Sequence, residues 1–233
     1  MASRGICSRR EADEMIQQGL VIVDNEIISK VGTKIRPDAE IVLAPEAINA
    51  RAKLATILIN KPPGYVATQA EKPYADIRTL ITTKNQYNAK HNEKNKTIDV
   101  KSLHTAGRLD IDSSGLLVLT QDGAIVRKLI HPTHPISKEY IVRVSGKITK
   151  SAIQLLEGGL SLDEKLLRPA KVLQINSNQL HFTLREGRKR QIRRMCDLVD
   201  LHVKSLVRVK IGMLCLADLP RGKWRFMRKD ERF

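Results

Sequence analysis

The stretch LHTAGRLDIDSSGLLVLT, residues 103–120, joins a cluster of charges to an apolar strand signal. The run from Leu116 to Leu119 has the length and composition of a buried strand. Just ahead of it, Arg108, Asp110 and Asp112 fall within five positions. Either this is an ordinary loop with a salt bridge, or the loop holds Asp110 in place for chemistry. The rest of the sequence must decide between these interpretations.

The chain has a large excess of positive charge. Its 233 residues carry a formal net charge of +16, and the sequence pI is about 10.0. Such an imbalance favours polyanionic partners over a particular fold. A membrane surface is the alternative partner, but no apolar stretch is long enough to span a bilayer and no signal peptide opens the chain. We therefore expect a soluble, cytoplasmic protein that does not bind membranes.

Cysteines and aromatic residues are few. The three cysteines are far apart and form no CxxC pair, so we expect neither a disulfide framework nor a metal site. Aromatic residues make up 3% of the chain, which argues against the broad base-stacking surfaces of proteins that bind single strands.

The first 46 residues predict a small helix-and-sheet unit. CSRREADEMIQQG should form a short helix in which Ser8 and Glu11 make a capping box. LVIVDNEII alternates around Asp24 and Asn25, which indicates a hairpin, and KIRPDAEIVL predicts a turn and another strand. The segment from Ala44 to Ala55 has no clear periodicity and is interpreted as a linker.

Residues 54–233 predict a second domain of interspersed strands and helices. A strand over 56–60 should end at Lys61, because two prolines follow it. Residues 82–101 are polar and predict a surface loop in which His91 is solvated. Several alternating strands without regular strand–helix repetition argue for an α+β fold rather than a doubly wound sheet.

The densest basic block is LREGRKRQIRRMCDLVDL, residues 184–201. Its apolar residues fall at helical spacing, so the arginines must fan outward from a core-facing stripe. The block is either a solvated basic surface or a phosphate-binding helix start with one arginine turned into a site. Composition favours phosphate contact.

Five short motifs along the chain resemble those of a known family. GRLD at 107–110, KEYIVRV from Lys138, EGRKRQIRRM from Glu186, NKPPG at 60–64 and the late LPRGKWR resemble bacterial ribosomal RNA pseudouridine synthases of the RsuA type. The segment GICSRREADEMIQQGLVIVDNE resembles the alpha-L RNA-binding module that this branch carries at its N-terminus. The resemblance covers nearly the whole chain.

The resemblance implies roles for individual residues. Asp110 would act on the sugar or the base of the target uridine, Tyr140 would stack on the uracil, and Arg193 would pair with Asp110. A carboxylate in a partly dry pocket stays ionised when a guanidinium lies nearby. Leu206 would pack against the base, while Arg108 would hold the loop or a phosphate; Asp112 would be a structural turn residue. The expected RNA contacts are Ser8, Arg9, Arg10, Lys30, Lys61, Arg188, Lys189, Arg190 and Arg194.

The implied reaction converts a uridine in ribosomal RNA into pseudouridine. An isomerisation needs no cofactor, and we expect none. We expect a monomer acting on large-subunit ribosomal RNA, either free or in an assembly intermediate. A small-subunit site is the alternative target, and a non-catalytic ribosome-assembly factor that binds RNA is the alternative function.

Overall fold

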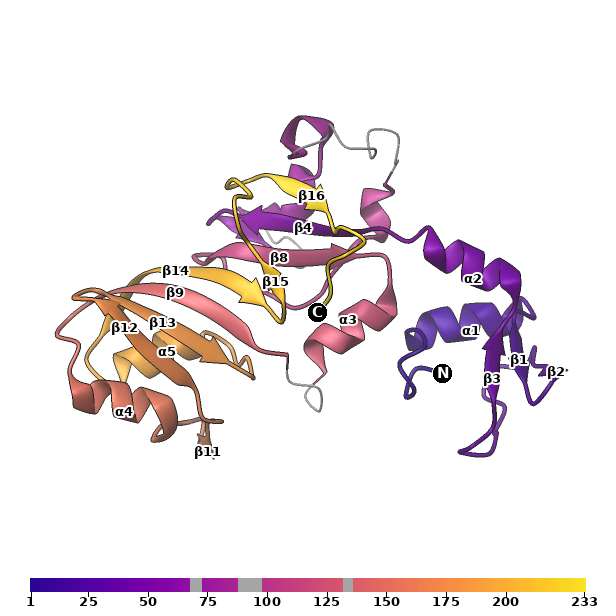
Figure 1. Cartoon of the computed structure of the whole chain (residues 1–233), viewed down its shortest axis with the longest axis horizontal. Helices are drawn as coiled ribbons and strands as arrows, with labels where there is room; N and C mark the ends of the chain where they lie inside the picture. Colours follow the sequence, from indigo (N-terminus) through magenta and orange to yellow (C-terminus); the bar gives the residue numbers. More distant parts are fainter. Residues whose placement is uncertain (68–72, 88–97, 132–135) are drawn as a thin grey trace.

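The computed structural model describes residues 1–67, 73–87, 98–131 and 136–233 of the chain. The expectation for His91 lies outside these residues. Figure 1 shows a small N-terminal unit beside a larger body built on one long, twisted sheet. Within the described ranges, no helix is long and apolar enough to cross a membrane.

The N-terminal unit contains the predicted helix and hairpin. Helix α1 (Arg9–Gln17) begins with the capping box of Ser8 and Glu11. Strands β1 (Val21–Val23), β2 (Glu26–Ile27) and β3 (Ile41–Leu43) form an antiparallel sheet in the order β2-β1-β3. Asp24 and Asn25 have positive φ angles of 46° and 70°, as a two-residue hairpin turn requires. The predicted hairpin is confirmed.

The segment predicted as a linker contains a helix. Helix α2 (Pro45–Ala52) begins with proline at a first-turn position, where its fixed φ is favourable and its missing N–H is not needed. Three of its eight residues are alanines and one is an arginine, and both residue types have high helix propensity. The segment lacks an apolar stripe, so periodicity could not reveal this helix.

The larger body is built on a nine-stranded mixed sheet. Seven strands follow the order β12-β13-β9-β14-β8-β4-β16, with β7 and β15 added at the side. All pairs are antiparallel except β14 with β8, which confirms the predicted α+β class. The strands are β4 (Thr56–Lys61), β7 (His104–Thr105), β8 (Ser114–Thr120), β9 (Lys138–Ser145), β12 (Lys171–Asn176), β13 (Gln179–Leu184), β14 (His202–Ile211), β15 (Leu214–Cys215) and β16 (Trp224–Phe226).

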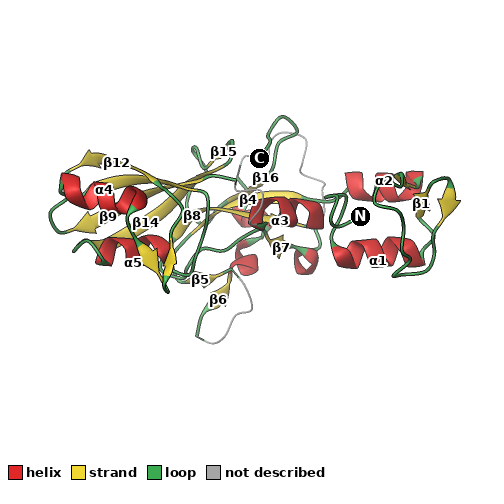
Figure 2. Cartoon of the chain, turned by 90° about the horizontal axis from the view of Figure 1, so that it is seen from below, coloured by secondary structure: helices red, strands yellow, loops and turns green. Residues whose placement is uncertain are grey.

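Helices cover both faces of this sheet. Helices α4 (Lys150–Gly158) and α5 (Gln191–Asp197) contribute to the larger apolar core, and α3 (Gly123–Ile130) contributes to a second core on the other face. Figure 2 places α3 between the main sheet and the N-terminal unit, with α4 and α5 at the far end. Short elements complete the fold: β5 (Tyr65–Val66), β6 (Ala75–Asp76), β10 (Ser161–Leu162), β11 (Lys165–Leu166) and 3-10 turns at Ile77–Leu80, Thr83–Asn85 and Val100–Ser102.

The opening apolar run is the buried centre of the sheet. Every residue of β8 is buried. Leu117 and Leu119 pack into the larger core, while Leu116 and Val118 pack into the second one. Because side chains alternate along a strand, a run that is apolar at every position can serve two cores at once. The predicted buried strand is confirmed.

Polar contacts join the N-terminal unit to the start of α3. The Gly123 N–H donates to Oε1 of Glu11 over 3.2 Å, and Arg51 in α2 forms a 3.1 Å ion pair with Asp122, the N-cap of α3. A side chain at position 123 would collide with Ser8 and Glu11. Close packing therefore requires glycine there.

Candidate active site

The Asp110 loop runs between β7 and β8 and is held from below by a buried lysine. The side chain of Lys61 is fully buried at the end of β4. Its Nζ donates to the carbonyl oxygens of Asp110 (3.1 Å), Ile111 (3.4 Å) and Ser113 (2.8 Å), as well as to that of Pro62 (3.1 Å). The loop that presents Asp110 is thus anchored to a core strand through one ammonium group.

Burial lowers the pKa of Lys61 to about 8, although the negative charges of Asp112 and Asp110 oppose this shift. The prediction that Lys61 contacts RNA is wrong, because its ammonium is enclosed by carbonyl oxygens and has no exposed surface. Sequence reasoning placed it correctly at the strand end. It could not show that the following loop folds back over the side chain.

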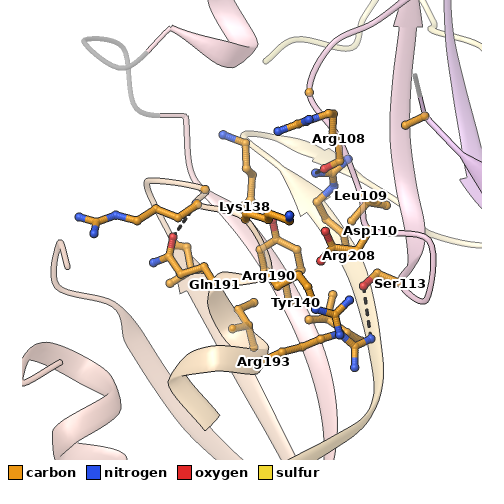
Figure 3. A pocket seen from close by; sticks show the side chains of 18 of the residues that line it. Arg108, Leu109, Asp110, Ser113, Lys138, Tyr140, Arg190, Gln191, Arg193 and Arg208 are labelled. Carbon is orange, nitrogen blue, oxygen red and sulfur yellow. Dashed lines mark hydrogen bonds between the residues drawn. The ribbon is translucent and has the colours of Figure 1, made fainter. Parts of the chain in front are cut away.

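A cavity of about 720 Å³ opens beside this loop. Its walls include Asp110, Tyr140, Arg193, Leu206 and Arg108, the five residues expected in the catalytic site and substrate pocket. These residues come from the loop before β8, from β9, α5 and β14, which are far apart in sequence. Figure 3 shows the labelled members of this group around one opening. A volume of this size suits a small organic group such as a nucleoside.

The apolar wall of the cavity comes from two paired strands. Tyr140 on β9 is 8% exposed, and Leu206 on β14 is 6% exposed. Their strands pair antiparallel, with Leu206 opposite Val142 and Arg208 opposite Tyr140. Residues directly opposite one another project from the same face of a sheet, so Tyr140 and Leu206 line the same side. A flat base could stack against such a surface.

Arg193 pairs with a different carboxylate from the one expected. Its Nη2 lies 3.2 Å from Oδ1 of Asp112 and donates to the Asp112 carbonyl (3.1 Å) and to Oγ of Ser113 (3.4 Å). Its Nη1 donates to the carbonyl of Val203 (3.3 Å). The expected pairing with Asp110 is therefore not the one found.

This pairing changes the role of Asp112. Arg190 also lies within 3.0 Å of the Asp112 carboxylate. Sequence reasoning made Asp112 a turn residue, but it is the acid that ties the loop to the start of α5. The carboxylate of Asp110, two residues earlier, forms no ion pair within the described residues, and it lies at the cavity.

The basic block divides into anchored and exposed side chains. The guanidinium of Arg188 donates to the carbonyls of Leu162, Lys165 and Leu166, so it holds the β10–β11 hairpin. Arg194 forms an ion pair with Asp163. Lys189 and Arg190 are exposed at the cavity.

In the N-terminal unit, three of the four expected RNA contacts are exposed cations: Arg9, Arg10 and Lys30. Ser8 differs, because its Oγ accepts a hydrogen bond from the Glu11 N–H as the cap of α1. RNA contact by all these residues stays a prediction.

Two further cations line the cavity and were not singled out from the sequence. Arg208 is 2% exposed, and Lys138 is partly buried at the start of β9. Both lie on strands in which apolar and polar residues alternate along the sequence. A charged side chain that faces inward is therefore easily assigned to the solvent-facing side of such a strand. Only the strand register shows that both face the same side as Tyr140.

Comparison with known proteins agrees with this architecture. A family model described as RNA pseudouridylate synthase matches residues 55–198, and an S4 domain model matches residues 1–41. The chain belongs to the RNA pseudouridine synthase family. As a pseudouridine synthase it is an isomerase, and its S4 domain binds RNA.

Relatives resemble this pseudouridine synthase along its whole length. An uncharacterized RNA pseudouridine synthase of Mycobacterium leprae is 32% identical, over 99% of this chain and 88% of the relative. The dual-specificity RNA pseudouridine synthase RluF of Escherichia coli K12 is also 32% identical, over 99% of this chain and 74% of RluF. A crystal structure of a pseudouridylate synthase superposes with a TM-score of 0.65 at 25% identity, covering 95% of this synthase and 90% of that chain.

Proposed function

We propose that this enzyme converts one specific uridine in large-subunit ribosomal RNA into pseudouridine, with Asp110, Tyr140 and Arg193 as its central residues. The observation that carries the proposal is the convergence of these three residues, with Leu206, on one cavity. The S4 domain and the net charge of +16 support a structured RNA as the substrate.

The reaction divides between the two walls of the cavity. The Asp110 carboxylate acts on the sugar or the base, the N1–C1′ bond breaks, and the base turns to form a bond from C5 to C1′. The proton leaves C5 and N1 gains one, so atoms balance without a redox partner or a transferred group. Tyr140 stacks on the uracil and assists removal of the C5 proton, and Leu206 packs against the base from the same side of the cavity.

Anchoring of the Asp110 loop supports this division. The loop is fixed by Lys61 from below and by Arg193 through Asp112 from the side. A reacting carboxylate has to be held close to its productive geometry, because small displacements cost large factors in rate. Arg193 therefore acts on the reaction by positioning the loop.

A uridine in folded RNA reaches this cavity only after leaving its stack, which costs a few kcal/mol. Arg108, Lys189 and Arg190, which line the cavity, contact the displaced backbone in this proposal. Stacking on Tyr140 offsets part of the cost, at about 1–3 kcal/mol per base.

The test is a map of pseudouridines in ribosomal RNA from cells with and without the gene. One large-subunit position should lose its modification and regain it on expression of the wild-type enzyme. Asp110→Asn should restore nothing while binding RNA within about threefold of wild type, because the change keeps the shape of the side chain but removes its charge. A lost position in small-subunit RNA would overturn the substrate. Restoration by Asp110→Asn would overturn the catalytic role of Asp110.

A further inference from the structure

The guanidinium of Arg208 is buried at the cavity with part of its hydrogen-bonding capacity unused. Its Nε donates to the Leu116 carbonyl (2.7 Å) and its Nη1 to the Arg108 carbonyl (3.2 Å). Its Nη2 is buried and has no hydrogen-bond partner. A buried charged donor without an acceptor costs free energy, so an acceptor that arrives at the cavity would recover part of that cost.

Lys138 adds a second cation to the same wall. It lies two residues before Tyr140 on β9, so both side chains project from one face. Arg208 is the register partner of Tyr140 on β14. Burial lowers the pKa of Lys138, and the positive charge of Arg208 lowers it further. Figure 3 shows both side chains beside Asp110 and Tyr140.

Neither cation forms an ion pair with an acid within the described residues. Within the described residues, Asp112 pairs with Arg190 and Arg193, and Glu186 bonds to Gln191. Asp110 lies at the same cavity but forms no ion pair with either cation. Lys138 donates to the carbonyl of Ile136 (3.2 Å), which carries no charge. Two like charges held together without an ion pair to an acid indicate a place for an anion that arrives with the substrate.

We propose that Lys138 and Arg208 form a subsite for the phosphodiester attached to the flipped uridine. This rests on the proposed function, which puts a uridine against Tyr140. A nucleotide stacked there carries its phosphate within a few ångströms of the same wall. A phosphate also matches the donors, since Arg208 offers a planar guanidinium and Lys138 a mobile point charge. The subsite holds the backbone while the base turns.

The experiment compares a nucleoside with its phosphates. Uridine, uridine 5′-monophosphate, uridine 3′-monophosphate and inorganic phosphate are titrated by NMR into Asp110→Asn enzyme at constant ionic strength. One monophosphate should bind about tenfold more tightly than uridine, as one desolvated charge contact allows. Which monophosphate is preferred identifies the side of the nucleotide that the subsite holds.

Substitutions then assign the contact. Lys138→Met, made in the Asp110→Asn enzyme, should remove most of the phosphate preference and leave uridine affinity unchanged. Lys150→Met is the matched control, because Lys150 is an exposed cation at the start of α4 and does not line the cavity, and it should preserve the preference. Arg208→Lys keeps the charge but loses the planar donor set, and should reduce the preference in part.

The proposal is overturned if the monophosphates bind no better than uridine, or if Lys138→Met weakens uridine equally. It is also overturned if Lys150→Met has the same effect, or if inorganic phosphate binds as tightly as the monophosphates. These titrations need no turnover. A failure of the subsite is therefore distinguishable from a failure of the proposed function, which appears only in the ribosomal RNA map.

Discussion

Replacing Arg193 by alanine tests the central geometric claim, which is that this arginine acts by holding the Asp110 loop. The side chain of Arg193 is 11% exposed, while that of Asp112 is 41% exposed. The ion pair is therefore partly screened by solvent and is worth up to about 1 kcal/mol. The two hydrogen bonds to backbone carbonyls involve a charged donor and contribute about 1–2 kcal/mol each in this setting. Arg193→Ala should lower the free energy of unfolding by about 2–5 kcal/mol.

The effect on activity should exceed the effect on stability. Without Arg193, the loop keeps its Lys61 anchor but loses its tie to α5 and to the Val203 carbonyl. A displacement of the Asp110 carboxylate by about 1 Å costs about 100-fold in rate. We expect kcat to fall by about that factor while RNA affinity changes little.

The assay is single-turnover conversion of a ribosomal RNA fragment that contains the mapped uridine, at a temperature where urea unfolding shows the variant to be folded. Arg194→Ala is the matched control, because Arg194 is the next residue and pairs with the exposed Asp163. It should keep activity within about threefold of wild type. Wild-type turnover by folded Arg193→Ala, or a larger loss in Arg194→Ala, would refute the reasoning.

Three further predictions follow from other contacts. Gly115→Ala should destabilise the protein by about 2–3 kcal/mol in urea unfolding, because the φ of Gly115 is +106° and a Cβ there would meet the Arg208 backbone. Gly158→Ala is the control, because Gly158 has open space around it, and it should be neutral or slightly stabilising. Equal effects of the two substitutions would contradict this account. Since the pKa of Lys61 is depressed to about 8, the folded state releases this proton before the unfolded chain does. The stability of wild type relative to Lys61→Met should therefore rise between pH 8 and 10.5, by at most about 3 kcal/mol, whereas a constant difference would argue against the shift. RNA affinity should fall steeply with salt, and replacing Arg9 and Arg10 together by alanine should reduce the slope of log K against log salt by about 1–2; an unchanged slope would remove them from the interface.

Local patterns were sufficient for several elements of this fold. The capping box of Ser8 and Glu11, the turn at Asp24 and Asn25 and the apolar run of β8 each depend on short-range chemistry, and each is found as predicted. Helix α2 was missed because no apolar stripe marks it.

The sequence by itself also determined that the partner is a polyanion, and its ordered motifs indicated the family and the residues that meet at the cavity. Only the tertiary structure decided which charges pair with one another. Arg193 binds Asp112 rather than Asp110, Lys61 is buried under the loop, and Arg208 faces the cavity. The physical reason is that an ion pair depends on distances of a few ångströms between residues some 80 positions apart, and those distances are set by strand register and loop path. No local pattern contains that information.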